Sequence, residues 1–114
     1  AKVMGTSLYA SCIYYSKKEA DGDVLKVYKN VKIDNRESEL KRFPGEEIVY
    51  IVNATSAYNA PEDEKFNHLV VLTNSATGWK LYRFNVIGQT PEIETEPVFV
   101  YSGKGTAGYV MLRK

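Results

Sequence analysis

The sequence predicts a mostly β fold, a small antiparallel β-sandwich or barrel of about seven strands with one short helix near residues 36–43. Two observations lead to this prediction. Short runs rich in Val, Ile, Tyr and Phe recur along the chain, and turn-forming residues separate them, as in all-β domains. The 114 residues, 44% apolar and 25% charged, have the size and composition of one globular domain, so we expect a single domain over residues 1–114.

The first two expected elements are strands. Residues 2–15 are rich in apolar side chains, with Gly5 at the place of a bulge, and they lead into a polar stretch. The pair Asp21–Gly22 is typical of a hairpin turn. A second strand is expected over residues 23–33, where apolar side chains alternate with lysines, so that one face is buried.

Residues 34–43 carry the helix pattern, with a cap at Asp34 or Asn35 and an end at Pro44–Gly45. We expect the charged side chains of this helix to face solvent. Residues 46–53 then include a consecutive run of β-prone apolar residues, which is typical of a strand buried on both faces. This strand is therefore expected at the centre of a sheet.

Residues 54–65 form the longest predicted loop, with an acidic tip at residues 62–64. Residues 66–73 and 79–87 follow as a hairpin that turns over residues 74–78. Alternate residues of the second arm share a face, and neither face is purely apolar.

The last predicted elements are a linker and a terminal hairpin. Residues 88–97 carry glutamates at alternate positions, as in an edge segment that is protected against unwanted pairing. Strands are expected over Val98–Tyr101 and Tyr109–Leu112, on either side of the glycine loop 103–108.

The glycine loop fits the G-x-G-x-x-G-x-V pattern of nucleotide-binding loops. A dinucleotide site needs a helix that begins at the third glycine, whereas Tyr109 begins a strand-like run. We therefore interpret the loop as a hairpin turn. A weaker hypothesis is a phosphate-binding or nucleotide-binding nest of backbone N–H groups, formed by Gly103, Lys104, Gly105 and Thr106.

Catalytic groups are scarce in this sequence, so we expect a protein that is not an enzyme, with no catalytic residues, no metal site and no cofactor. His68 is the single histidine, which is too few for a zinc site built from several His or Cys ligands. The interpretation of His68 as a packed strand residue is favoured over its use as a general base. A metal-free ribonuclease that uses His68 with Glu47 and Arg83 is the alternative.

Cysteine usage and charge indicate the compartment and the class of partner. Cys12 is the only cysteine, so no internal disulfide can form, which favours the cytoplasm or a virion or particle assembled there. No apolar stretch is long enough for a membrane helix, and no association with a membrane is expected. The net charge is +1, well below the basic balance of most nucleic-acid-binding proteins.

The first functional hypothesis is a non-catalytic protein-binding module, such as an inhibitor, an accessory subunit or a particle component. Nine tyrosines provide rigid amphipathic contact area, and the 54–65 loop provides an exposed segment on a scaffold. The residues expected to contact the partner protein are Tyr58, Asn59, Trp79 and Tyr82.

The second hypothesis is an OB-like domain that binds single-stranded nucleic acid, because basic and aromatic residues are interleaved in two strands. Aromatic side chains would stack on bases, and lysine and arginine would neutralise phosphates. The residues of this hypothesis are Tyr28, Lys26, Lys29, Trp79, Lys80, Tyr82 and Arg83. The sequence leaves the oligomeric state open.

Overall fold

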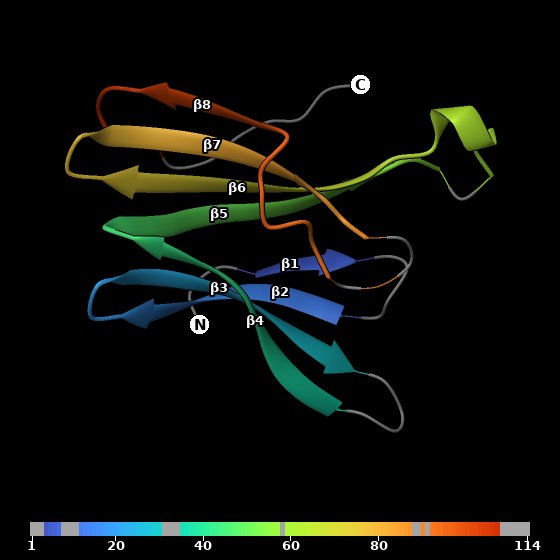
Figure 1. Cartoon of the computed structure of the whole chain (residues 1–114), viewed down its shortest axis with the longest axis horizontal. Helices are drawn as coiled ribbons and strands as arrows, with labels where there is room; N and C mark the ends of the chain where they lie inside the picture. The colour runs from blue at the N-terminus through green and yellow to red at the C-terminus, as the bar shows by residue number, and fades with distance from the viewer. Residues whose placement is uncertain are drawn as a thin grey trace.

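The computed structural model describes residues 4–7, 12–30, 35–57, 59–87, 90 and 92–107. Within these residues the chain forms eight strands and one short 3₁₀ helix (Figure 1). The elements are β1 (Met4–Ser7), β2 (Cys12–Glu19), β3 (Gly22–Asn30), β4 (Asn35–Pro44), β5 (Glu46–Thr55), η1 (Glu62–Glu64), β6 (Asn67–Ser75), β7 (Gly78–Asn85) and β8 (Phe99–Gly103).

The strands form two four-stranded antiparallel sheets, in the orders β1-β2-β3-β4 and β5-β6-β7-β8. Each strand pairs with its neighbour in the sequence, so both sheets are simple meanders. The two sheets lie next to each other in Figure 1, and β5 follows directly from β4. The predicted mostly β, antiparallel fold is confirmed. Among the described residues there is no helix long and apolar enough to cross a bilayer.

Side chains from both sheets form one hydrophobic core. Tyr14 of β2, Phe43 of β4 and Phe84 of β7 are among its largest fully buried members. The Phe43 ring meets the ring of Tyr82 edge-on, with 5.1 Å between centroids, and that of Phe84 at 6.2 Å. Such aromatic pairs add about 0.5–1.5 kcal/mol to the free energy that burial supplies. The aromatic residues of β4 and β7 therefore hold the two sheets together.

The turn from the first sheet to the second depends on two glycines. A Cβ atom on Gly22 would lie 2.3 Å from the carbonyl oxygen of Phe43, so only glycine fits there. Gly45 has φ 74° and its N–H donates to the carbonyl of Asp21 at 2.6 Å.

The sequence predicts the hairpin turn between β2 and β3 at Asp21–Gly22. Glu19 pairs with Gly22, so the two loop residues of this turn are Ala20 and Asp21. The predicted turn at Asp21–Gly22 is thus displaced by one residue.

The predicted helix near residues 36–43 is wrong, because this segment lies within β4 and pairs with β3 along its length. Its glutamates, leucine, lysine and arginines favour a helix. A helix of two turns is marginal in water unless it packs an apolar stripe, and this segment offers only Leu40 and Phe43. Pairing with β3 satisfies the backbone and buries Phe43, so tertiary pairing overrides local propensity.

The predicted burial of residues 46–53 on both faces is also wrong. β5 is an edge strand, and of the five consecutive apolar residues only Ile48 and Ile51 are buried. The register with β6 shifts between Ile48 and Tyr50, which makes Val49 the extra residue of a β-bulge. The bulge interrupts the regular alternation of the strand, so Ile48 and Ile51, which are three residues apart, both face the core.

Most of the remaining strand predictions agree with the structure where it describes them. The hairpin of residues 66–87 is β6 and β7, joined by Ala76 and Thr77. The prediction of a single strand over residues 2–15 is wrong, because its residues belong to two antiparallel strands, β1 and β2. Val98–Tyr101 largely matches β8, whereas Tyr109–Leu112 lies outside the described residues.

Candidate functional site

The side of the second sheet that faces away from the core carries a row of aromatic and basic side chains. Along β7, Tyr82 and Phe84 are buried in the core, so the alternating residues point to the other side. Cross-strand pairing places Leu81 beside Tyr101 and Arg83 beside Phe99. We call this surface the outer face, and it consists of Trp79, Leu81, Arg83, Phe99 and Tyr101.

Trp79 and Gly103 are direct cross-strand partners on the outer face. A Cβ atom on residue 103 would lie 2.5 Å from Cε2 and Cζ2 of the Trp79 indole. The absence of a side chain at Gly103 therefore leaves the space that the indole occupies. Beside this pair is a hollow of about 250 Å³, and Lys80 and Lys104 contribute to its lining.

Arg83 makes two contacts that involve no carboxylate. Its Nη2 lies 3.0 Å from Nε2 of His68, and its guanidinium carbon lies 5.2 Å from the centroid of the Phe99 ring. Because a guanidinium only donates, Nε2 of His68 is the acceptor and the ring proton is on Nδ1. Burial and then the charge of Arg83 lower the pKa of His68. The His68 ring also stacks on Phe66, with 5.3 Å between centroids.

The structure does not bring the three ribonuclease candidates together. Arg83 contacts His68. Glu47, however, is the cross-strand partner of Asn74, at the far end of β6 from His68. Its Oε2 lies 3.9 Å from Nζ of Lys18. Six residues separate positions 68 and 74 along the strand, which is roughly 20 Å. Over the described part of the chain, no group of three or more His, Cys, Asp or Glu side chains is placed to hold a metal ion.

Tyr82, expected in both binding surfaces, lies in the core and is only 8% exposed. Its hydroxyl donates to the Glu46 carboxylate, at 2.6 Å from Oε1 and 2.8 Å from Oε2, and Thr73 donates to the same carboxylate. Burial, followed by this hydrogen bond, raises the pKa of Tyr82. The alternation in the sequence shows which residues lie on the same side of the strand as Tyr82, but it does not show which of the two sides is buried. Tyr82 is therefore a structural residue.

The loop residues of the protein-binding hypothesis are described only in part. Tyr58 lies outside the described residues, and Asn59 is exposed. The acidic tip forms η1, which has no buried residue and projects from the end of β5 and β6 (Figure 1). Of the four expected contact residues, Asn59 and Trp79 remain accessible.

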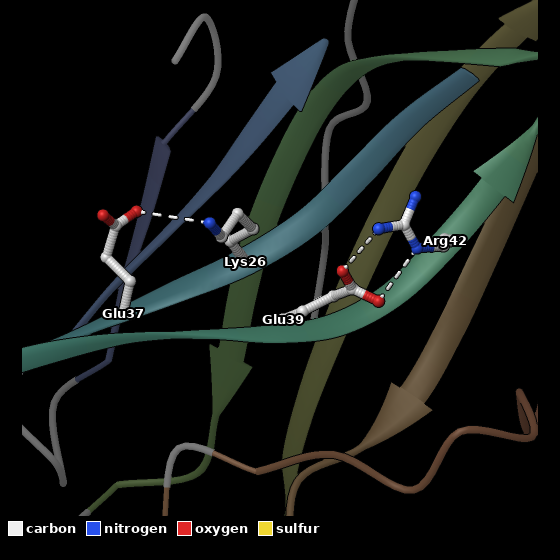
Figure 2. Close-up of polar contacts among 4 residues, drawn as sticks. All are labelled: Lys26, Glu37, Glu39 and Arg42. Carbon is white, nitrogen blue, oxygen red and sulfur yellow. Dashed lines mark hydrogen bonds and ion pairs between the residues drawn. The ribbon is translucent and has the colours of Figure 1, made fainter. Parts of the chain in front are cut away.

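The residues of the nucleic-acid hypothesis are divided between the two sheets. Lys26, Tyr28 and Lys29 belong to β3, and the others belong to β7. Lys26 forms an ion pair with Glu37 at 3.5 Å, as Figure 2 shows. On β7, the alternation directs Lys80 to the side opposite Trp79 and Arg83. These residues do not form one continuous stacking platform.

The glycine loop is explained by packing and by backbone conformation. Gly103 accommodates the Trp79 indole, and Gly105 has φ 84°, a conformation that favours glycine. Lys104 and Thr106 are exposed. The side chain of Asn74 then exchanges two hydrogen bonds with the backbone of Ala107, at 2.8 and 2.9 Å. These contacts account for the glycines without a ligand.

The two outermost strands β4 and β8 differ in charge. β4 carries Glu37, Glu39 and Arg42, and Figure 2 shows the bidentate pair between Arg42 and Glu39, at 2.9 and 3.1 Å. β8 has the sequence Phe-Val-Tyr-Ser-Gly, with no charge. Natural edge strands are usually protected by charges. The sequence predicts an edge segment over residues 88–97 that its glutamates protect, whereas the edge strand at this end of the second sheet, among the described residues, is β8, which carries no charge. The uncharged run of residues 97–103 is the sequence signal for this edge.

No family model matches this sequence, and comparison of the chain with curated proteins and with solved structures finds no significant match.

Proposed function

We propose that this chain is a non-catalytic protein-binding module, such as an inhibitor, an accessory subunit or a particle component, and that it binds its partner through β8 and the outer face. One observation carries the proposal. Five of the six large hydrophobic side chains that are exposed in the described residues belong to the second sheet and its flanking segments. They are Phe66, Ile87, Val98, Val100 and Tyr101.

Exposed apolar residues scattered singly over a protein need no explanation, but several of them on one strand indicate an interaction site. Val98, Val100 and Tyr101 all lie on or directly before β8. Tyr101, at 58% exposure, is the most exposed of the group and is tilted against Phe99, with 4.7 Å between ring centroids. A tyrosine held in this way offers a large contact area at a small cost in side-chain entropy.

The distribution of charge favours a protein partner over a nucleic acid. Binding to phosphates requires several cations that are free to contact them. Lys26 is paired with Glu37, and Arg83 is packed against His68 and Phe99. The neighbouring β8 contributes apolar surface and no charge. A location in the cytoplasm, or in a particle assembled there, stays a prediction from the single cysteine.

The test is affinity capture from the source cells with three forms of the full chain, followed by reconstitution with the purified partner. The forms are the natural chain, the double variant Val98→Ser with Tyr101→Ser, and the control Ile13→Ser. Ile13 is exposed in the first sheet, so its variant removes an exposed apolar side chain away from β8 and the outer face. We expect one protein to bind the natural chain and the control directly, and the double variant at least tenfold more weakly.

Two outcomes would contradict the proposal. The first is a reconstituted partner with the same dissociation constant for all three forms. The second is saturable binding of a single-stranded oligonucleotide whose affinity falls steeply with salt, because that behaviour belongs to the nucleic-acid hypothesis.

A further inference from the structure

β8 is the open edge of the second sheet. The order β5-β6-β7-β8 leaves one side of β8 without a neighbouring strand among the described residues. An edge strand presents backbone N–H and C=O groups that can pair with another chain. At the opposite edge of this sheet, Asp23 of the first sheet accepts a hydrogen bond from the Ile48 N–H at 2.9 Å, so β5 is partly covered.

The chain that follows β8 turns away from this open edge. Ala107 is hydrogen-bonded to the side chain of Asn74 on β6. β6 lies on the far side of β7 from β8, and neighbouring strands are about 4.8 Å apart. Residue 107 is therefore placed roughly 10 Å from β8, on the side away from the open edge.

The side chains of β8 are compatible with an added strand. Val100 and Tyr101 are consecutive, both are exposed, and they point to opposite sides of the sheet. A partner strand with apolar residues at alternate positions would contact Val100 on one side, or Tyr101 on the other. No charge in β8 would oppose such a strand.

Two lysines lie at the end of β8 that is defined by Gly103. Lys80, which pairs with Ser102, points to the side of the sheet opposite Trp79, and Lys104 follows β8; both residues contribute to the lining of the hollow between these strands. Within the described chain, neither ammonium group lies in an ion pair with a carboxylate. Two unpaired cations at one end of an uncharged edge favour a partner segment that carries acidic residues at the corresponding end.

We propose that β8 accepts an extended segment of the partner protein as an additional antiparallel strand, with alternating apolar residues along β8 and acidic residues next to Lys80 and Lys104. This inference rests on the proposed protein-binding function and specifies its mechanism. In an antiparallel strand the acidic residues precede the apolar run. Main-chain hydrogen bonds to β8 provide the affinity, and the acidic residues fix direction and register.

The test uses designed peptides on the full chain, because the natural partner is not needed. The probe begins with two glutamates and continues with alternating threonine and valine, and its matched control begins with two lysines. Trp79 is the only tryptophan and lies beside the hollow, so its fluorescence reports binding. We expect saturable binding of the acidic peptide at concentrations below about 1 mM and at least tenfold weaker binding of the basic one.

Backbone methylation distinguishes strand addition from simple apolar contact. Only alternate N–H groups of an added strand face the sheet. Two versions of the acidic peptide, N-methylated at odd or at even positions, should therefore differ at least tenfold in affinity. The double variant Lys80→Gln with Lys104→Gln should bind the acidic and basic peptides alike, whereas the control Arg42→Gln, on β4, should behave as the natural chain.

Three results would overturn the inference. The acidic peptide gives no response, as expected if the chain's own residues 109–112 pair with β8. The two methylated peptides bind equally. Sedimentation finds a dimer, and the substitution Val100→Lys dissociates it, which would mean that β8 pairs with a second copy of this chain. If a captured partner still depends on Val98 and Tyr101 in any of these cases, the protein-binding function stands and only strand addition fails.

Discussion

The carboxylate of Asp23 accepts a hydrogen bond from the backbone N–H of Ile48, with 2.9 Å between Oδ2 and the nitrogen. Asp23 is at the start of β3 and is 4% exposed, and Ile48 is a buried residue of β5. The bond therefore joins the two sheets through the core. It also satisfies an N–H group immediately before the bulge at Val49, where the ladder with β6 is irregular.

Replacement of Asp23 by alanine should leave this buried N–H group without an acceptor. We expect Asp23→Ala to lower the free energy of unfolding by about 1–3 kcal/mol, measured by urea denaturation. Asp23→Asn retains a carbonyl oxygen at the same place and is the matched control. Equal stability of the alanine and asparagine variants would show that the hydrogen bond contributes nothing.

Stability at alkaline pH should depend on Tyr82. Burial and the bond to Glu46 raise its pKa above the ordinary value of 10.0, so the folded chain retains this proton when the unfolded chain has lost it. The stabilisation is complete below pH 10 and is lost as the pH rises above it. We expect Tyr82→Phe to have a smaller loss of unfolding free energy between about pH 9 and about pH 11 than the natural chain.

The control for this effect is Tyr28→Phe, a tyrosine on β3 of the first sheet. Tyr14 also has a pKa raised by burial, so Tyr82→Phe should reduce the alkaline slope without abolishing it. Identical slopes for the natural chain and the two variants would contradict the prediction.

His68 should make the protein less stable in mildly acidic solution. Burial and the neighbouring Arg83 lower its pKa below the ordinary value of 6.5. The unfolded chain therefore binds this proton first, and stability that is present above pH 6.5 is lost as the pH falls through that value. His68→Gln, which keeps an acceptor for Arg83, should remove this dependence. An NMR titration that places the pKa of His68 at or above 6.5 would contradict the explanation.

Gly103→Ala should displace the indole of Trp79. The added Cβ atom would lie 2.5 Å from the ring, so the ring must move, at a cost of roughly 1–3 kcal/mol. We expect a shift in the emission maximum of Trp79 together with lower stability. Gly105→Ala is the matched control, because nothing lies within 4 Å of its Cβ position. Its φ of 84° is strained for alanine, so it should lose stability without a change in emission.

The sequence predicted the elements whose pattern is local. The hairpin of β6 and β7 follows from alternating apolar residues on both sides of a short polar turn, and the structure reproduces it. The alternation also placed Trp79 and Arg83 on one face and Tyr82 on the other. It could not show that the face of Tyr82 is the buried one, because this depends on the first sheet, which packs Phe43 against that ring.

The incorrect predictions involve interactions between strands that are not visible in a local pattern. The charged residues of segment 34–43 predict a helix, whereas pairing with β3 makes this segment the strand β4. The consecutive apolar residues of segment 46–53 predict a central strand, whereas a bulge at Val49 explains the same run at an edge. Only the sheet order shows that β8 has no neighbouring strand on one side among the residues that the structure describes.

The meander topology has a consequence for the order in which the molecule is built. Because each strand pairs with the one before it, the first sheet can complete its hydrogen bonds once β4 has been synthesised. Its apolar residues Tyr14, Val27 and Phe43 are covered only when β6 and β7 follow. During synthesis from the N-terminus, the apolar side chains that the first sheet contributes to the core therefore stay exposed until the second sheet has formed.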